Sequence, residues 1–380
     1  MARAKATGPE VTRARFALRE ADAKRIGAGI VMPVNPRLAV DARPLVSGGS
    51  GRMGYGATLD FLFDVGGAPR ARVREAERFS ALAQADLALS RGSARVRALS
   101  AYVSAQIAEL RISEADAALV VAHRVQDATQ RRVNAGAGSE IDAASAQLQV
   151  AELEAARMAF ERDRATSEMD LRDALDLDSN VALTLTSSIM DPPAVGEVTA
   201  LLQRALTTHP ELKALQARVA MWSATEERLR AEVFPKVGFY AGLDAAPLSP
   251  TYGVLGLSVE LPVAQRNQGL RAQSARARES AEADLNLESR LLARAVVSAL
   301  SSYQSSLREL DRLSTQAVPA AERTLSFAEA GFQAGRFDVF RLLAAARDSL
   351  RVRASRIDAI EAAWFARIEL ERAVGGEVKS

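Results

Sequence analysis

The sequence repeats itself at a nearly constant interval of about two hundred residues. Gly8-Pro9-Glu10 is matched by His209-Pro210-Glu211, and Ala135-Gly136 is matched by Ala334-Gly335. An internal repeat of this kind constrains the architecture before any single residue does, because each copy must form the same unit and the units must pack together.

Each copy contains two short segments in which apolar residues alternate with small or charged ones. The alternation covers residues 37–43 and 55–65 in the first copy, and 237–244 and 255–261 in the second. A period of two is typical of a strand with one apolar face, and turn-forming residues join the two strands of each pair. Two hairpins of this length fit a tilted crossing of a lipid bilayer, although a half-buried hairpin on a soluble core is the alternative. The residues expected to face lipid are Leu59, Phe61, Phe63, Phe239, Leu257 and Leu261.

A very long helical stretch follows each hairpin. The runs at 68–133 and 265–332 contain no proline other than Pro69 and Pro319. Each run would extend about 100 Å as an α-helix, and its apolar residues recur every three or four positions, which predicts coiled-coil packing. Pro319 is expected to kink or loosen the second run.

A glycine-containing turn ends each long run, and a second helix returns from it. Ser139 with Asp142 has the spacing of a capping box, and Asp338 is a suitable N-cap. The short helix before each hairpin and the returning helix together nearly equal the long helix in length. We therefore expect them to stack end to end along it, as a rod with a hairpin at one end and a tight turn at the other.

The predicted fold class is mainly α with a small β part, divided into two repeats and a connecting linker. The first repeat, residues 1–177, comprises a helix at 8–30, a hairpin at 36–66, a long helix at 68–133 and a returning helix at 139–176. The linker, residues 178–206, is predicted to be irregular. The second repeat, residues 207–376, comprises a helix at 208–232, a hairpin at 235–263, a long helix at 265–332 and a returning helix at 338–374.

Composition argues against several classes of function. The chain has no cysteine, which excludes disulfides, thiolate catalysis and zinc-thiolate sites, and its two histidines lie far apart in the sequence. A formal net charge of +2 gives no electrostatic footprint for nucleic acid. The sequence contains no run of about eighteen apolar residues, so it predicts no transmembrane helix. No nucleophile elbow, phosphate loop or metal-ligand cluster occurs, so we expect no enzyme, catalytic residue, cofactor or metal site.

The order and spacing of these parts resemble those of the TolC-like outer membrane efflux protein family, in particular its CzcC-like metal-efflux branch. The matching segments are His209–Gly242 (HPELKALQARVAMWSATEERLRAEVFPKVGFYAG), Gly256–Pro262 (GLSVELP) and Phe332–Leu350 (FQAGRFDVFRLLAAARDSL). The resemblance covers nearly the whole chain, and the duplication itself is its most specific part.

The resemblance implies a homotrimer in the outer membrane and periplasm of a Gram-negative bacterium. Three sets of four strands would close a twelve-stranded barrel in lipid, and the helices would close a tunnel across the periplasm. Physics agrees that an oligomer is required, because four strands cannot close a barrel and open edges are not viable in lipid. The implied function is a passive exit duct of a tripartite efflux system, with a periplasmic membrane-fusion adaptor and an inner-membrane pump, expected to be of the RND type. The family's signal peptide is not recognisable at the N-terminus, and we expect the chain to start after it.

The resemblance also places the two helical turns at a periplasmic tip that docks the adaptor. The residues expected there are Asn134, Gly136, Gly138, Ser139, Gly335, Arg336 and Asp338. Some members close the tip with an aspartate ring, but the corresponding positions here are Arg341 and Ala344, with Asp142 and Ser145 in the first copy. We expect any gate at these four positions, with Arg336 and Arg341 available to pair with Asp142. Solvated tip charges are the alternative, since exposed pairs contribute only about 0–1 kcal/mol.

Two other functions stay open from the sequence. One is a TolC-like exit duct for type I protein secretion, and the other is a soluble periplasmic coiled-coil scaffold. The scaffold accounts for the long helices but not for two hairpins patterned alike at equal positions in each copy. No residue pattern selects among a metal cation, a drug and a polypeptide as the substrate.

Overall fold

The computed structural model describes residues 2–44, 53–246 and 250–378. The connections at 45–52 and 247–249, which fall in the predicted hairpin turns, lie outside the described residues. The chain divides into two compact units, and both long helical stretches begin in the second unit and end in the first. The first unit is formed by Met1–Arg13, Leu89–Pro210 and Ser289–Ser380, and the second by Ala14–Ala88 and Glu211–Glu288.

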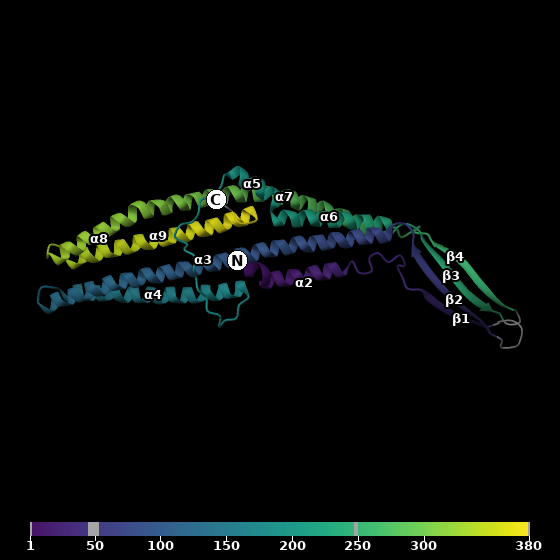
Figure 1. Ribbon diagram of the computed structural model, residues 1–380, viewed down its shortest axis with the longest axis horizontal. Helices are drawn as coiled ribbons and strands as arrows, with labels where there is room; N and C mark the ends of the chain where they lie inside the picture. The colour runs from purple at the N-terminus through teal and green to yellow at the C-terminus, as the bar shows by residue number, and fades with distance from the viewer. Residues whose placement is uncertain (1, 45–52, 247–249, 379–380) are drawn as a thin grey trace. The chain divides into compact units, whose positions relative to one another are not determined.

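The described part of the second unit contains an antiparallel sheet with the strand order β1-β2-β3-β4 (Figure 1). The hairpins of the two repeats join into one continuous sheet through β2 and β3, although they lie far apart in the sequence. The strands are β1 (Arg37–Pro44), β2 (Met53–Asp64), β3 (Lys236–Ala245) and β4 (Thr251–Glu260).

In the same unit, two short helices line the first part of the long helix α3 (Ala68–Asn134). From α2 (Pro9–Ala23), Asp22 accepts a hydrogen bond of 2.5 Å from the hydroxyl of Ser80 on α3. From α6 (Pro210–Ala231), Arg228 forms an ion pair of 2.7 Å with Glu75 on α3. Polar contacts thus hold one short helix from each repeat against the same long helix.

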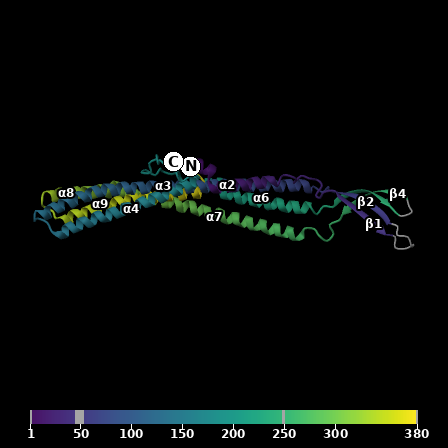
Figure 2. The same ribbon diagram turned by 90° about the horizontal axis from the view of Figure 1, so that it is seen from below.

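In the first unit, four helical segments pack side by side (Figure 2). They are the second part of α3, α4 (Glu140–Leu175), α8 (Val318–Gln333) and α9 (Val339–Val374). The 36-residue lengths of α4 and α9 are equal, as expected for repeated elements. Among the described residues, no helix is sufficiently long and apolar to cross a membrane.

The returning helices end next to the starts of the short helices. In the first repeat, Arg3 donates a hydrogen bond of 3.1 Å to the carbonyl oxygen of Leu175, the last residue of α4. In the second repeat, the ring Nε2 of His209, between α5 (Val198–Thr208) and α6, lies 3.1 Å from the carbonyl oxygen of Arg372 in the last turn of α9. These contacts place the ends together within the first unit, which is the arrangement that end-to-end stacking requires.

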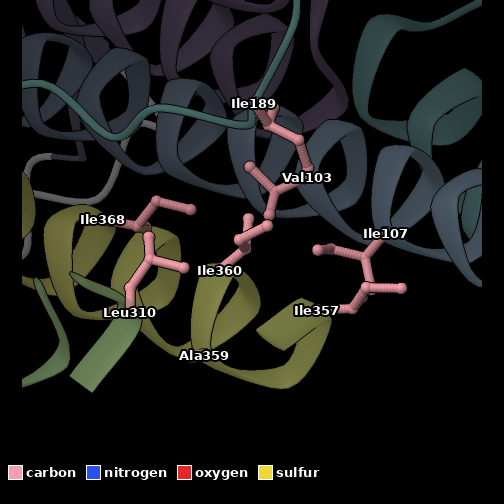
Figure 3. Packing of buried hydrophobic residues seen from close by; sticks show 8 residues of the cluster. All are labelled: Val103, Ile107, Ile189, Leu310, Ile357, Ala359, Ile360 and Ile368. Atoms are coloured by element: carbon pink, nitrogen blue, oxygen red, sulfur yellow. The ribbon is translucent and has the colours of Figure 1, made fainter. Parts of the chain in front are cut away.

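An apolar cluster joins α3, α9, α7 (Gln268–Arg312) and the linker in the first unit (Figure 3). Val103 and Ile107 of α3 point toward Ile360 and Ile357 of α9. Fully burying an aliphatic side chain of this size stabilises the fold by about 1.5–3 kcal/mol. The remaining members of the cluster are Ile189, Leu310, Ala359 and Ile368.

The second long helical run is not a single α-helix. A π-helical turn, η1 (Leu313–Ala317), separates α7 from α8, and the N–H of Val318 donates to the carbonyl oxygen of Leu313, five residues back. Pro319 follows at the start of α8 and has no N–H to donate to the preceding turn. The run predicted at 265–332 is helical only from Gln268, and it changes its hydrogen-bond pattern immediately before this proline.

Two further segments differ from the predicted boundaries. The helix predicted at 8–30 begins earlier as α1 (Ala2–Thr7), followed by α2, and the helical hydrogen bonding of α2 ends at Ala23. The chain then forms tight turns, in which Gly27 adopts a φ of +82° that favours glycine and is incompatible with a continuing right-handed helix. The linker predicted to be irregular at 178–206 contains most of α5.

Candidate functional site: the two-faced sheet and the helical turns

One face of the sheet is apolar. The register places Phe61 of β2 beside Phe239 of β3, and Phe239 beside Leu257 of β4. Leu257 is 74% exposed, so the rest of the described chain does not cover this face. An uncovered apolar face of this extent is the surface that lipid can cover. Of the residues predicted to face lipid, Leu59, Phe61, Phe63, Phe239 and Leu257 lie on this face, and Leu261 directly follows β4.

The opposite face carries mainly small, charged and hydroxyl-bearing side chains, with Leu62 and Val254 as apolar exceptions. Arg43 of β1 forms ion pairs of 2.5 Å with Asp41 on its own strand and 2.9 Å with Asp244 on β3. The side chain crosses β2 at Gly56, where an added methyl group would collide with both Asp41 and Arg43. A polar face opposite an apolar one is the pattern of a strand with water on one side and lipid on the other. Further residues on the polar face are Arg37, Thr58, Asp60, Lys236, Gly238, Tyr240, Gly242, Gly256, Ser258 and Glu260.

The sheet has two open edges. Among the described residues, β1 pairs only with β2, and β4 pairs only with β3. The outer N–H and C=O groups of both strands therefore need partners from outside the chain if the sheet lies in lipid. If the sheet lay on a water-soluble core, water would form hydrogen bonds with these edge groups, and no partner strand would be needed.

The first helical turn is fixed by its own backbone and caps. Gly136 has a φ of +72°, and the N–H of Ala137 donates to the carbonyl oxygen of Arg132 at 2.8 Å. The hydroxyl of Ser139 accepts from the N–H of Ile141, and the carboxylate of Asp142 accepts from the N–H of Ser139. This is the predicted capping box, and it satisfies N–H groups that the start of α4 would otherwise leave free.

The second turn has the same backbone plan with an aromatic addition. Gly335 has a φ of +69°, and Asp338 accepts a hydrogen bond of 2.8 Å from the N–H of Arg341. The Phe337 ring packs against Gly331, where a methyl group would collide with it. The Arg341 guanidinium lies 4.8 Å from the centre of the Phe337 ring. This cation–π contact is absent from the sequence analysis, and the helical spacing rule does not predict it, because Phe337 lies before the N-cap of α9.

The expected gate residues are not brought together within one chain. The Asp142 carboxylate is used in the cap of α4, and the ion pairs among the described residues do not join it to Arg336 or Arg341. Arg341 and Ala344 are exposed, whereas Ser145 is half-buried. The exposed tip positions are Asn134, Gly136, Ser139, Gly335, Arg336 and Asp338, with Gly138 half-buried. A gate therefore stays a prediction about contacts between copies.

A buried polar network that the sequence analysis missed anchors the linker. Arg95 of α3 and Arg367 of α9 both pair with Glu371, at 2.7 Å and 3.5 Å. Arg367 and the Tyr303 hydroxyl also donate to the carbonyl oxygen of Pro193, at 3.1 Å and 2.5 Å. Burial raises the pKa of Tyr303, against the opposing effect of Arg367, so the phenol stays protonated and able to donate. The four-residue spacing of Arg367 and Glu371 was a visible signal, but Arg95 gave none.

The fold is one shared with solved outer membrane channels, a protomer of long helices that carries a small antiparallel sheet. A family model described as outer membrane efflux protein matches residues 3–176 and 201–376. The chain belongs to the outer membrane efflux protein family, so the predicted resemblance and fold class are confirmed.

Similar proteins agree with this assignment. The cobalt-zinc-cadmium resistance protein CzcC of Cupriavidus metallidurans is 28% identical over 330 residues, which cover 84% of this chain and 76% of CzcC. The solved outer-membrane channel OprN has a TM-score of 0.81 at 21% identity, covering 99% of this chain and 88% of OprN. The outer membrane protein VceC from Vibrio cholerae has a TM-score of 0.78 at 19% identity, covering 99% of this chain and 95% of VceC. The two solved structures share the fold.

Family membership fixes the general function and location. The chain is an outer membrane exit channel component of a tripartite efflux system, in the outer membrane and periplasm of a Gram-negative bacterium. Its family and structural neighbours are channel proteins. Channels of this kind are trimeric and work with an adaptor and an inner-membrane pump.

Proposed function

We propose that three copies of this chain form a homotrimer in which β4 of each copy pairs with β1 of the next. Twelve strands then close one barrel, with the apolar face toward lipid and the polar face toward a water-filled pore. The observation that carries this proposal is the combination of an exposed apolar face with two open sheet edges. Pairing between copies gives the two open edges hydrogen-bond partners. The closed barrel then presents the apolar face to lipid without any open edge.

The helical turns are proposed to be the docking site for a periplasmic membrane-fusion adaptor, with a pump of the RND type beneath it. The support for adaptor docking is that both turns are exposed and share one backbone conformation. Gly136 and Gly335 hold the same left-handed conformation, and Ser139 and Asp338 cap the helices that follow. Paired turns of one shape, repeated around a trimer, give an adaptor a regular set of binding positions.

Divalent transition-metal cations are the proposed substrate class. The support is the 28% identity to CzcC, whose name describes resistance to cobalt, zinc and cadmium. A host lacking its own metal-efflux channel would be given this chain together with a metal-efflux adaptor and pump. We expect growth in zinc and cobalt to be restored, while tolerance to a hydrophobic drug stays unchanged. Restored drug tolerance or polypeptide export alone would contradict the metal class and leave the exit channel in place.

The assembly itself is tested by mass measurement of the purified protein. In detergent, multi-angle light scattering should give a protein mass of three chains, and removal of the detergent should cause aggregation. A monodisperse monomer without detergent would rule out the proposed assembly and favour the soluble scaffold. A charged residue on the apolar face, as in Phe239→Asp, should reduce insertion into lipid vesicles, whereas Tyr240→Asp on the polar face should not.

A further inference from the structure

A small cavity lies among four helices of the first unit. Its volume is about 70 Å³, and its wall is formed by α3, α4, α8 and α9, the helices that pack side by side in Figure 2. Ala117 of α3 is on this wall and is exposed, so small solutes can reach the cavity from outside. Protein interiors contain few voids larger than a water molecule. A space of this size is therefore a candidate site for a small ligand.

Most of the cavity wall is apolar. Ala118 of α3 and Ala346 of α9 are buried there, and their short side chains leave the space open. Leu153 of α4 and Leu325 of α8 line the cavity from the other two helices. A water-sized group occupies roughly 10–15 Å³, so the cavity holds about five to seven of them. The apolar wall favours a short hydrocarbon chain over a cluster of water, because each water molecule needs roughly two to four polar partners.

Two buried polar side chains on the wall have unused hydrogen-bonding groups. Ser349 of α9 is 2% exposed, and its hydroxyl forms no hydrogen bond with any residue that the structure describes. Gln149 of α4 is 6% exposed, and its Oε1 accepts a hydrogen bond of 2.6 Å from Nε of Arg347. Because arginine only donates, this contact leaves the amide N–H groups of Gln149 as donors, and they have no acceptor within the described chain. Buried polar groups are normally paired, so these two indicate a polar partner inside the cavity.

The charged side chains on the wall are already paired. Arg353 of α9 forms ion pairs of 3.3 Å with Glu114 of α3 and 2.9 Å with Glu322 of α8. Among the described residues that line the cavity, Glu114 and Arg353 alone are charged. A charged ligand would find no unpaired counter-charge there, and burying it would cost more free energy than burying a neutral molecule. The cavity therefore fits a neutral ligand.

We propose that this cavity binds a short, neutral aliphatic alcohol of about the size of n-butanol. The alkyl chain lies among the alanine and leucine side chains, and the hydroxyl oxygen accepts a hydrogen bond from the Gln149 amide and pairs with the Ser349 hydroxyl. A ligand that binds only the folded chain stabilises it, so the alcohol strengthens the packing of the four helices. The site lies within one chain and requires neither the assembly of copies nor a particular exported substrate.

An engineered cysteine tests the site in a chain that has no cysteine of its own. Ala118→Cys places a thiol on the cavity wall, and mass spectrometry follows its labelling by methyl methanethiosulfonate with increasing n-butanol in detergent. We expect n-butanol to slow this labelling until the site is saturated. Ala137→Cys, in the exposed first helical turn, is the control and should be labelled at an unchanged rate. Val121→Cys, which also lines the cavity, is a second reporter if Ala118→Cys does not fold.

Removal of the serine hydroxyl tests the chemical class of the ligand. When Ser349→Ala is added to the reporter, the n-butanol concentration that halves the labelling rate should rise about five- to tenfold, because a buried hydrogen bond is lost. Thr129→Val is the matched control. The buried hydroxyl of Thr129 donates to the carbonyl oxygen of Val125 at 2.8 Å and does not line the cavity, so its removal should leave this concentration unchanged.

Each contrary result overturns a stated part of the site. Labelling of the reporters that n-butanol does not slow would show that the cavity holds water only. Equal protection with and without the Ser349 hydroxyl would rule out an alcohol held at this residue. Reporters that are not labelled at all would show that solutes cannot enter the cavity. All three results would leave the proposed assembly and exit function standing.

Discussion

The two repeats share one element plan but hold their returning helices differently. At equivalent positions α4 has Glu168 and Arg172, whereas α9 has Arg367 and Glu371, so the signs of the charges are exchanged. The α4 pair has side-chain exposures of 22% and 18%, and the α9 pair has 9% and 3%. Glu371 also pairs with Arg95 of α3. Both helices carry an ion pair at the same spacing, but the α9 pair is buried and joined to α3, whereas the α4 pair is more exposed.

The long helices differ in the same way. In the first repeat α3 continues without interruption past Val120, and in the second repeat the counterpart of Val120 is Pro319, which follows the π-helical turn. The first repeat thus combines a regular long helix with an uncovered returning helix. The second combines an interrupted long helix with a buried returning helix. Burial within the described chain is therefore concentrated on α9, whereas α4 has few buried residues.

Removing the buried carboxylate of Glu371 should cause the largest difference in unfolding free energy between the two repeats. Glu371→Gln leaves Arg95 and Arg367 without their carboxylate in a buried position, which should lower the free energy of unfolding by about 3–5 kcal/mol. The matched change in α4, Glu168→Gln, breaks pairs near the surface and should cost about 0–1 kcal/mol. Urea unfolding in detergent measures both. Equal losses would show that the two pairs are equivalent despite their different burial.

Truncating an apolar residue of α9 and its equivalent in α4 should give the second largest difference in unfolding free energy. Ile357→Ala removes a buried side chain from the contact with α3 and should lower the free energy of unfolding by about 2–5 kcal/mol. Met158→Ala in α4, 199 residues before Ile357 and 54% exposed, should change it within about 0.5 kcal/mol. Urea unfolding in detergent measures both losses. An equal loss for Met158→Ala would show that the exposed position contributes as much as the buried one.

Exchanging residues at the helix interruption tests the contrast between the long helices. Val120→Pro places a proline inside α3 and should cost about 3 kcal/mol or more, because it removes a helical hydrogen bond and clashes with the preceding turn. The reverse change, Pro319→Val, should raise the thermal midpoint and slow amide exchange at Leu313–Ala317, which a proline no longer disturbs. Circular dichroism and hydrogen exchange record these changes. A lower midpoint for Pro319→Val would contradict them.

The caps at the two turns should give the smallest effect. Asp338→Ala removes the side chain that caps α9 and should cost about 1 kcal/mol. Asp142→Ala removes only the second half of a capping box in which Ser139 still caps α4, so its cost should be smaller. Amide exchange in the first turn of each helix provides the comparison. A larger loss for Asp142→Ala would point to a role for this carboxylate beyond the cap.

Local and periodic features were predictable from the sequence. The Ser139 and Asp142 spacing gave the capping box, and the alternation around Phe61 and Phe239 gave strands with one apolar face. These features depend on neighbours within a few residues, or on a period that the sequence displays directly. The duplication then placed the same elements in both copies.

Features that depend on distant residues were not predictable. The joining of β2 to β3 and the pairing of Arg95 with Glu371 link residues far apart in the sequence, and no local pattern records them. In the π-helical turn before Pro319, the N–H of Val318 donates to the carbonyl oxygen of Leu313, and only the proline itself marks this change in the sequence. The prediction of a helix at 8–30 was wrong beyond Ala23, because it gave more weight to the Ala and Arg content than to Gly27.

The central claim is that copies of this chain enclose a continuous water-filled exit duct. Conductance across a planar lipid bilayer tests it most directly, using detergent-purified trimer added to one side. We predict discrete current steps in salt solution, which Phe239→Asp abolishes by preventing insertion and Tyr240→Asp preserves. Trimeric, folded protein that inserts into the bilayer without passing any current, under both voltage polarities, would contradict the claim.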